Sequence, residues 1–155
     1  MSKQSSDEIE ILLHRSEIQD LCYRFADAVN TRKIDNLTAL WSDDGIWKIN
    51  PPIDIEIHGT ANIATAVTNL LNNWEFFVQK IHGGVIDIDD KQATARWTMS
   101  EIGRSISDKG FYNLGVYIDK YVYLNDSWLF AERIYEFTYI DESVLPGKSF
   151  PKILV

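Results

Sequence analysis

The stretch FADAVNTRKIDNLTALWSDDGIWKI, residues 25–49, passes from a helical pattern through a polar corner into a short aromatic strand pattern. Residues 30–33 break the helix, and a short second helix is predicted from Ile34 to Trp41 before SDDG turns the chain. The strand IWKIN then ends at Pro51. Upstream, apolar residues recur at the three- and four-residue steps of one helix face, at Ile11, Ile18, Leu21, Cys22, Phe25, Ala28 and Val29.

The remainder of the chain changes from a third helical pattern to strands. Gly59 and Thr60 precede a helix with a plausible threonine cap. Long β-branched and aromatic segments follow, separated by Asp, Asn and Gly turns, at residues 74–90, 92–105, 110–126 and 127–141. Helices followed by an antiparallel meander predict an α+β fold. We expect a single domain over residues 1–155, with a core of about 8–140 and a C-terminal tail, 141–155, that is loose or draped over a partner.

Composition excludes several functional classes. A chain of 155 residues with 45% hydrophobic content can bury one core. Its formal net charge of −8 disfavours nucleic acid and anionic membrane surfaces. Neither an apolar leader nor a run of 18 apolar residues is present, so a cytoplasmic protein is expected. Cys22 is the only cysteine and is expected to be a buried, inert thiol, and the three histidines show no ligand spacing, so neither a metal nor a cofactor is expected.

The order of these features resembles the SnoaL-like group of the nuclear transport factor 2-like superfamily over roughly residues 8–140. The resemblance is carried by the helix and corner of residues 25–49, by Gly59, by His82 before a strand, and by the G-x-Y-x-D and D-x-W-x-F elements, which contain Asp119 and Trp128. It implies a cone-shaped roll, with three N-terminal helices packed in a curved, mainly antiparallel sheet. It also implies a mostly apolar pocket for a small apolar molecule.

Within this superfamily, scytalone dehydratase implies a catalytic histidine at His82, oriented by an acidic residue whose position is held here by Asn30. An amide can hydrogen-bond an imidazole but cannot stabilise an imidazolium by charge. The dehydratase's second histidine falls near Gly103 and its pocket tyrosine on Ile49, so both of those groups are missing. We expect His82 to reach into the cone, held by Asn30, a backbone carbonyl or a carboxylate. The alternative is a structural histidine.

Ketosteroid isomerase implies a base at Ile49 and an oxyanion tyrosine at Phe25, and both are replaced. Its protonated aspartate falls on Asp119, which we expect to face the cavity as a neutral acid among aromatic rings. The alternative is that Asp119 ties its strand to Arg133 or Lys120. Strand alternation places Ala95, Trp97, Met99 and Glu101 on one face, and the resemblance to the family implies that this is the pocket face. Glu101 is a second proton-handling candidate, or else a partner in a salt bridge at the rim.

Two functions remain open. One is a cofactor-independent lyase or isomerase for a small, apolar, cyclic or aromatic substrate, with His82 as base or acid and Asp119 or Glu101 as the second group. The other is a non-catalytic binding protein or accessory subunit. In either case the predicted pocket wall contains Tyr117, Trp97, Trp47, Ile49, Phe25 and Met99. The aromatic content of the last strands predicts a homodimer through the outer face of the sheet.

Overall fold

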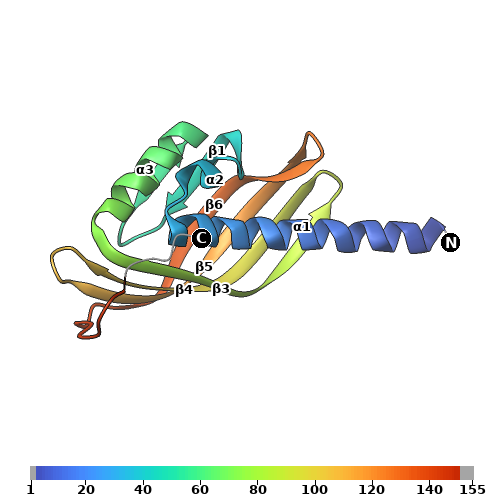
Figure 1. Cartoon of the computed structure of the whole chain (residues 1–155). Helices are drawn as coiled ribbons and strands as arrows, with labels where there is room; N and C mark the ends of the chain where they lie inside the picture. The colour runs from blue at the N-terminus through green and yellow to red at the C-terminus, as the bar shows by residue number, and fades with distance from the viewer. Residues whose placement is uncertain (1–2, 151–155) are drawn as a thin grey trace.

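The computed structural model describes residues 3–150, with side chains from residue 8 onward. Helix α1 (Lys3–Thr31) and the short α2 (Ile34–Thr38) are followed by strands β1 (Trp41–Ile49) and β2 (Ile55–His58) and by helix α3 (Thr60–Asn72). The long strands β3 (Trp74–Asp89), β4 (Gln92–Ser105), β5 (Gly110–Leu124) and β6 (Ser127–Asp141) complete the fold. The six strands form one curved sheet, and the helices lie on its inner side (Figure 1).

The sheet has the strand order β2-β1-β6-β5-β4-β3. Strands β3 to β6 form successive antiparallel hairpins, β1 pairs antiparallel with β2, and only the β1–β6 pair is parallel. Each of the three hairpin turns contains residues with positive φ, Asp90 in the first, Asp108 in the second, and Asn125 and Asp126 in the third. Short polar residues tolerate this left-handed backbone better than other non-glycine residues. The predicted α+β roll with a mainly antiparallel sheet is therefore confirmed.

The polar corner differs from its prediction. Trp41 begins β1 instead of ending a helix, and SDDG lies within that strand, where the pairing with β6 shifts register between Trp41 and Ile46. A Cβ atom on Gly45 would lie 2.8 Å from the Trp41 ring, so only glycine fits this bulge. Thr60 does not cap α3, because its hydroxyl donates to the Ser42 carbonyl instead (3.0 Å). The corner therefore serves architecture, since it attaches α3 to the edge of the sheet.

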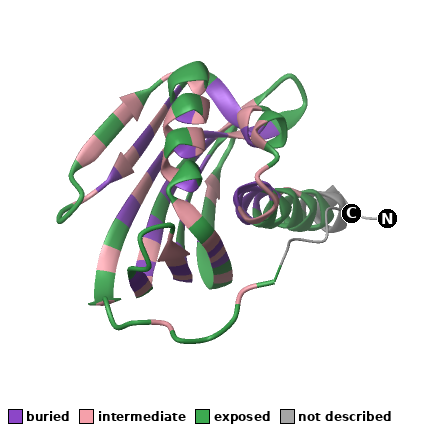
Figure 2. Ribbon diagram, turned by 60° about the vertical axis from the view of Figure 1, so that its left-hand side comes forward, coloured by how far each residue is buried: buried purple, intermediate pink, exposed green. Residues whose placement is uncertain are grey.

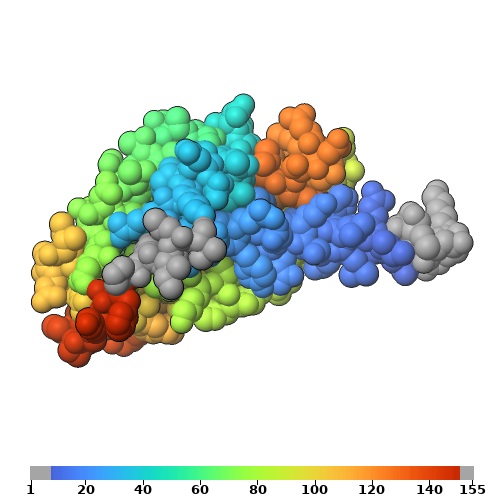
Figure 3. All heavy atoms as spheres, in the orientation of Figure 1, coloured from blue at the N-terminus to red at the C-terminus, as the bar shows by residue number. Residues whose placement is uncertain are grey.

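Helix α1 packs its buried residues against the sheet along its C-terminal half, and His14 alone of the described side chains before Ile18 is partly buried, where it contacts Trp128 and Tyr123. Its buried stripe begins at Ile18 and continues to Val29, whereas Ile11 is 50% exposed and Leu12 is 64% exposed. The predicted stripe is thus wrong at Ile11, because the sheet ends before the helix does. The N-terminal part of the helix projects beyond the sheet (Figure 3), and from residue 8 to residue 13 its described side chains are exposed (Figure 2). Among the described residues, no helix is both long and apolar enough to cross a membrane.

The described part of the C-terminal tail contacts the sheet of its own chain. Arg104 on β4 donates from Nη1 to the carbonyl oxygens of Leu145 and Gly147, both at 2.7 Å. The same guanidinium forms a two-point ion pair with Glu75 on β3, and Ser149 also hydrogen-bonds to Glu75. These contacts hold the pKa of the Glu75 carboxyl down at about 2. The tail up to Phe150 is therefore attached through the Arg104–Glu75 pair.

The outer face of the sheet carries apolar side chains that no helix covers. Ile118 on β5 is 38% exposed, Tyr112 on the same strand is 38% exposed and Tyr139 on β6 is 50% exposed. Exposed apolar residues grouped on a sheet are typical of partner surfaces. The homodimer through this face stays a prediction.

Candidate functional site

A cavity of about 280 Å³ lies between the helices and the concave side of the sheet. Helix α1 contributes Phe25 and Val29 to its wall, and α3 contributes Val67, Leu70 and Leu71. Every strand except the short β2 also contributes to this wall. The aromatic lining residues are Phe25, Trp47, Trp74, Phe77, Phe111, Tyr117, Tyr135 and Phe137. Such an apolar, aromatic cavity suits a small ring-containing molecule.

The cavity has an exposed end and a buried end. Its exposed lining residues are Pro52, Ile53, Lys109, Ile140 and Glu142. They come from the loop after β1, the turn before β5 and the end of the chain's last strand, and they form the mouth. Lys109 and Glu142 carry opposite charges there. The mouth therefore imposes no single sign of charge on an entering molecule, and selection by charge must come from the buried end.

The buried end is polar and is organised around Glu101 of β4, which is only 8% exposed. Gln79 of β3 donates from Nε2 to Glu101 Oε1 (2.8 Å) and to the Tyr117 hydroxyl oxygen (2.7 Å). Asn113 of β5 donates from Nδ2 to Glu101 Oε2 at 3.4 Å. The carboxylate is thus held by neutral amides contributed by the two strands that flank its own.

Several polar atoms of this wall have no hydrogen-bond partner among the described residues. They are Gln79 Oε1, Asn113 Oδ1, Tyr135 OH and Trp47 Nε1, and each belongs to a buried side chain that lines the cavity. The carboxylate of Glu101 fixes both amides with their NH₂ groups toward it, so each carbonyl oxygen is left as an acceptor. Buried acceptors without partners are costly. A ligand that donates hydrogen bonds would relieve that cost.

Burial also sets the proton affinity of the buried end. Desolvation raises the pKa of the Glu101 carboxyl above its ordinary value of 4.5, and hydrogen bonds from Gln79, Asn113 and Tyr135 oppose the rise. The Tyr135 hydroxyl is close enough to Glu101 to favour its charged form, although it makes no hydrogen bond of normal geometry. Desolvation likewise raises the pKa of the Tyr117 and Tyr135 hydroxyls. Both tyrosines therefore stay neutral donors at physiological pH.

Asn30, at the end of α1, holds β3 instead of an imidazole. Its Nδ2 donates to the Gln79 carbonyl oxygen (2.8 Å), and the Gln79 backbone N–H donates to Asn30 Oδ1 (2.7 Å). The side-chain amide thus pairs with the backbone as a neighbouring strand would. Asn30 does not line the cavity. It fixes the strand position from which the Gln79 side chain reaches Glu101.

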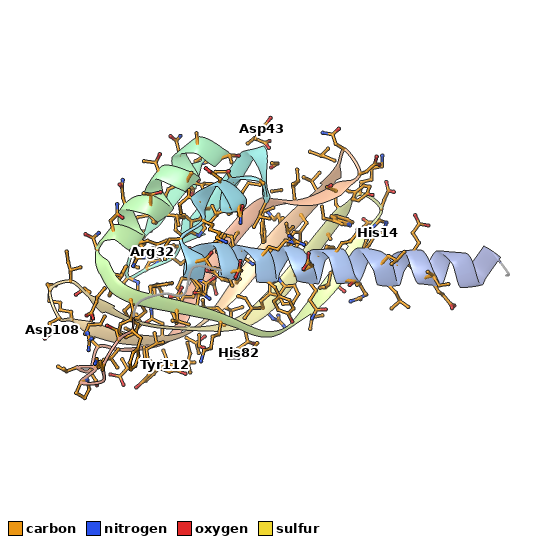
Figure 4. The ribbon with its side chains drawn as sticks, in the orientation of Figure 1. His14, Arg32, Asp43, His82, Asp108 and Tyr112 are labelled. Atoms are coloured by element: carbon orange, nitrogen blue, oxygen red, sulfur yellow. The ribbon has the colours of Figure 1, made fainter. Side chains whose placement is uncertain are left out.

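His82 is not where the family resemblance places it. The pairing of β3 with β4 shifts register between Ile81 and Gly84, and His82 lies in this irregular stretch. Its side chain is on the side of β3 that faces away from α1 (Figure 4), it is exposed, and its Nε2 hydrogen-bonds with Ser100 Oγ (2.8 Å). It is not among the residues lining the cavity. The expectation that its imidazole reaches into the cone is therefore wrong.

Asp119 is fully buried but lies outside the cavity wall. Arg133 on β6 donates to both of its oxygens, Nε to Oδ1 and Nη2 to Oδ2, each at 2.8 Å. The Tyr121 hydroxyl adds a third bond at 2.6 Å. A two-point pair with a guanidinium requires a carboxylate. The expected neutral acid is thus wrong, and the alternative of an Arg133 tie holds.

Arg133 itself is enclosed by aromatic rings. Its guanidinium carbon lies 3.9 Å from the centre of the Tyr117 ring and 4.4 Å from that of Phe25. Its Nη2 also contacts the Cys22 sulfur at 3.0 Å. Burial raises the pKa of that thiol to about 11, which agrees with the inert thiol expected from the sequence.

The predicted wall is partly as expected. Tyr117, Trp47, Ile49 and Phe25 line the cavity together with Glu101. Trp97 and Met99 are buried in the core beside it and do not line it. Trp97 packs on Gly84, where a Cβ atom would collide with the indole, and its Nε1 donates to the Tyr121 hydroxyl at 2.9 Å.

The sequence reading missed Gln79, Asn113 and Tyr135. Strand alternation carried a signal for each of them, because Gln79 follows Phe77 by two residues, Asn113 precedes Gly115 by two, and Tyr135 follows Arg133 by two. Gln79 and Asn113 are uncharged amides, so a pattern of acid–base groups does not single them out. Among the described residues, no three His, Cys, Asp or Glu side chains come together to hold a metal ion.

The sequence pattern of the SnoaL-like domain family matches residues 10–134. No curated protein matches the chain in sequence. Among solved structures, hexachlorocyclohexane dehydrochlorinase LinA Type2 superposes with a TM-score of 0.82 at 19% identity, over 94% of this chain and 97% of that one. A provisionally assigned scytalone dehydratase from Novosphingobium aromaticivorans gives 0.78 at 16% identity, over 90% and 97%. These likenesses show a shared fold.

Proposed function

The chain belongs to the SnoaL-like domain family, and from this premise we propose that it is a cofactor-independent lyase or isomerase for a small, apolar, cyclic or aromatic substrate. The observation that carries the proposal is Glu101, a buried carboxylate at the closed end of an aromatic cavity. The dehydrochlorinase and dehydratase with the same fold support the lyase class. They do not identify the substrate.

Glu101 has the properties of a general base or acid. Desolvation raises its pKa, and a carboxylate with a raised pKa binds a proton more strongly than an exposed one does. In an elimination, Glu101 would take a proton from the carbon next to the one that carries the leaving group. The C–H electron pair would form the double bond, and the leaving group would depart with the electrons of its own bond.

The neighbouring groups have supporting roles in this scheme. Gln79 and Asn113 orient the carboxylate through their amide donors. The Tyr135 hydroxyl has no hydrogen-bond partner among the described residues, so it can donate to a leaving group or to an enolate oxygen. Asn30 is a positioning residue, because it acts on Glu101 only through the backbone of Gln79.

Exchange of carbon-bound hydrogen tests the proposal without knowledge of the leaving group. The protein is incubated in D₂O with cyclohexanone, 3-hydroxycyclohexanone and chlorinated cyclohexanes, and proton NMR follows loss of C–H signal and product formation. We expect catalysed exchange or elimination with at least one compound, and a loss of about 100-fold or more in Glu101→Gln. The same rate in wild type and Glu101→Gln would overturn the proposal.

A non-catalytic binding protein is the second candidate. It is favoured by the cavity lining, which includes no histidine among the described residues, and by the amide at Asn30, so that Glu101 has no histidine beside it as a second proton-handling group. Compounds that bind in the cavity but undergo no exchange in the NMR experiment would support this candidate.

A further inference from the structure

We infer that the cavity binds a small primary amine in its ammonium form, with the ammonium group against Glu101, Gln79 and Asn113 and the apolar body among the aromatic rings. The inference shares the cavity of the proposed function but goes beyond it. Recognition requires only the charge and the acceptors of the buried end, and it does not depend on turnover.

The first step is charge. The Glu101 carboxylate is buried, and its hydrogen-bond donors are the neutral amides of Gln79 and Asn113. The nearby guanidinium of Arg133 is already engaged in two bonds by Asp119. A buried carboxylate without a counter-charge is unfavourable, and it is stabilised by a cation that comes within bonding distance. The net charge of −8 also favours the approach of a cation.

The second step is the hydrogen-bond inventory. An ammonium group has three N–H donors and no acceptor. The buried end offers the Glu101 carboxylate, Gln79 Oε1 and Asn113 Oδ1 as acceptors, and the two amide oxygens have no partner among the described residues. The strands β3, β4 and β5 each contribute one of these acceptors, and their number matches the three donors of an ammonium group. A neutral alcohol could supply only one donor.

The third step is the surrounding wall. Tyr117, Tyr135, Trp47 and Phe25 are among the rings that line the cavity with Glu101. The faces of aromatic rings attract cations, most strongly where water is excluded. The cavity volume of about 280 Å³ accommodates a monocyclic amine. The unpartnered Trp47 indole N–H adds one donor, so an ether or hydroxyl oxygen on the ligand would gain a partner.

Calorimetric titration of wild-type protein with matched ligands tests the inference. Benzylamine, benzyl alcohol and benzoate share one ring and differ in charge, and benzyltrimethylammonium keeps the charge but has no N–H. We expect benzylamine to bind about tenfold or more tightly than benzyl alcohol, and benzoate most weakly. Benzyltrimethylammonium should be weaker than benzylamine, because it leaves both amide oxygens unpaired. Benzyl alcohol or benzoate binding as tightly as benzylamine would overturn the inference.

Proton release gives a readout that needs no variant. Burial raises the pKa of the Glu101 carboxyl above its ordinary value in the empty cavity. An ammonium requires the charged form, so binding should release protons and tighten as pH rises, over the range in which the amine stays protonated. The other ionisable groups lining the cavity are Tyr117 and Tyr135, which stay neutral, and Lys109 and Glu142 at the mouth. Calorimetry in two buffers of different ionisation enthalpy counts the protons, and a count of zero at every pH contradicts the inference.

Two variants complete the design. Glu101→Gln should weaken benzylamine by about tenfold or more and benzyl alcohol by less than about threefold. Glu8→Gln removes the same charge from an exposed position on α1 and should leave both affinities unchanged. Circular dichroism confirms folding of both variants. If the protein binds benzylamine but catalyses no C–H exchange, only the proposed function is contradicted. If it catalyses C–H exchange but binds benzyl alcohol more tightly than benzylamine, only this inference is contradicted.

Discussion

Asp119 and Glu101 are buried carboxylates on the neighbouring strands β5 and β4, yet the sheet places them in opposite situations. Asp119 receives two bonds from Arg133 and one from Tyr121, and it has no contact with the cavity. Glu101 lies in the cavity wall beside neutral groups, the amides of Gln79 and Asn113 and the Tyr135 hydroxyl. The ring of Tyr117 lies between the two sites, since it stacks on Arg133 while its hydroxyl accepts a bond from Gln79.

Burial alone does not make a carboxylate available to bind a proton or a ligand. A counter-charge satisfies Asp119 and commits it to structure. The lack of one leaves Glu101 able to bind a proton or a cation.

Asp119→Ala should have the largest effect on stability. It leaves the Arg133 guanidinium buried without a counter-charge, and breaking a buried pair in this way costs about 3–5 kcal/mol. Urea unfolding measures the loss. The double variant Asp119→Leu with Arg133→Met removes both charges and should be more stable than the single variant. If the double variant is the less stable of the two, the ion pair is not what holds this part of the core.

Gly115→Ala should disturb the cavity side. A Cβ atom at this position would collide with the Tyr135 ring, which lines the cavity. We expect overpacking to cost about 1–3 kcal/mol in the free energy of unfolding, and the displaced ring to weaken ligand binding. Gly83→Ala is the matched control, because nothing lies within 4 Å of a Cβ atom there. Equal losses in both variants would mean that strand flexibility, not the Tyr135 contact, sets the effect.

Glu101→Gln should change how stability depends on pH. The folded-state pKa of Glu101 lies above its unfolded value of about 4.5, so the folded state binds more protons between the two values. This contribution to stability is complete below pH 4.5 and is lost as pH rises through the folded-state pKa. Subtracting the unfolding free energies of wild type from those of Glu101→Gln at each pH should give a difference that grows with pH. A flat difference would show that Glu101 has the same proton affinity in both states.

His82→Ala should have the smallest effect. The imidazole is exposed and bonds with Ser100 on the outer side of the sheet, away from both buried carboxylates. We expect a change of about 0.5 kcal/mol or less in unfolding free energy and no change in the affinity for benzylamine. A loss of affinity comparable to that of Glu101→Gln would mean that His82 enters the cavity in the ligand-bound protein.

The amino-acid sequence was sufficient to predict the fold and some of the residues that line the cavity. The helical stripe from Ile18 to Val29 and the aromatic strands separated by Asp, Asn and Gly turns specify local structure, which depends on near neighbours in the chain. Alternation with a period of two gave the residues that share a face with Glu101 and with Tyr117, and the resemblance to the family identified the pocket face. These features need no knowledge of which strand pairs with which.

Which polar side chains come into contact depends on the tertiary structure. The register of β5 with β6 sets Asp119 directly opposite Arg133, and His82, three residues after the inward-facing Gln79, lies on the outer side of the sheet. Gln79, three residues before His82, reaches Glu101 instead. Such outcomes depend on contacts between residues far apart in the chain, and a change of one residue in register moves a side chain to the other face of a sheet. Strand pairing therefore determines which buried carboxylate receives a counter-charge.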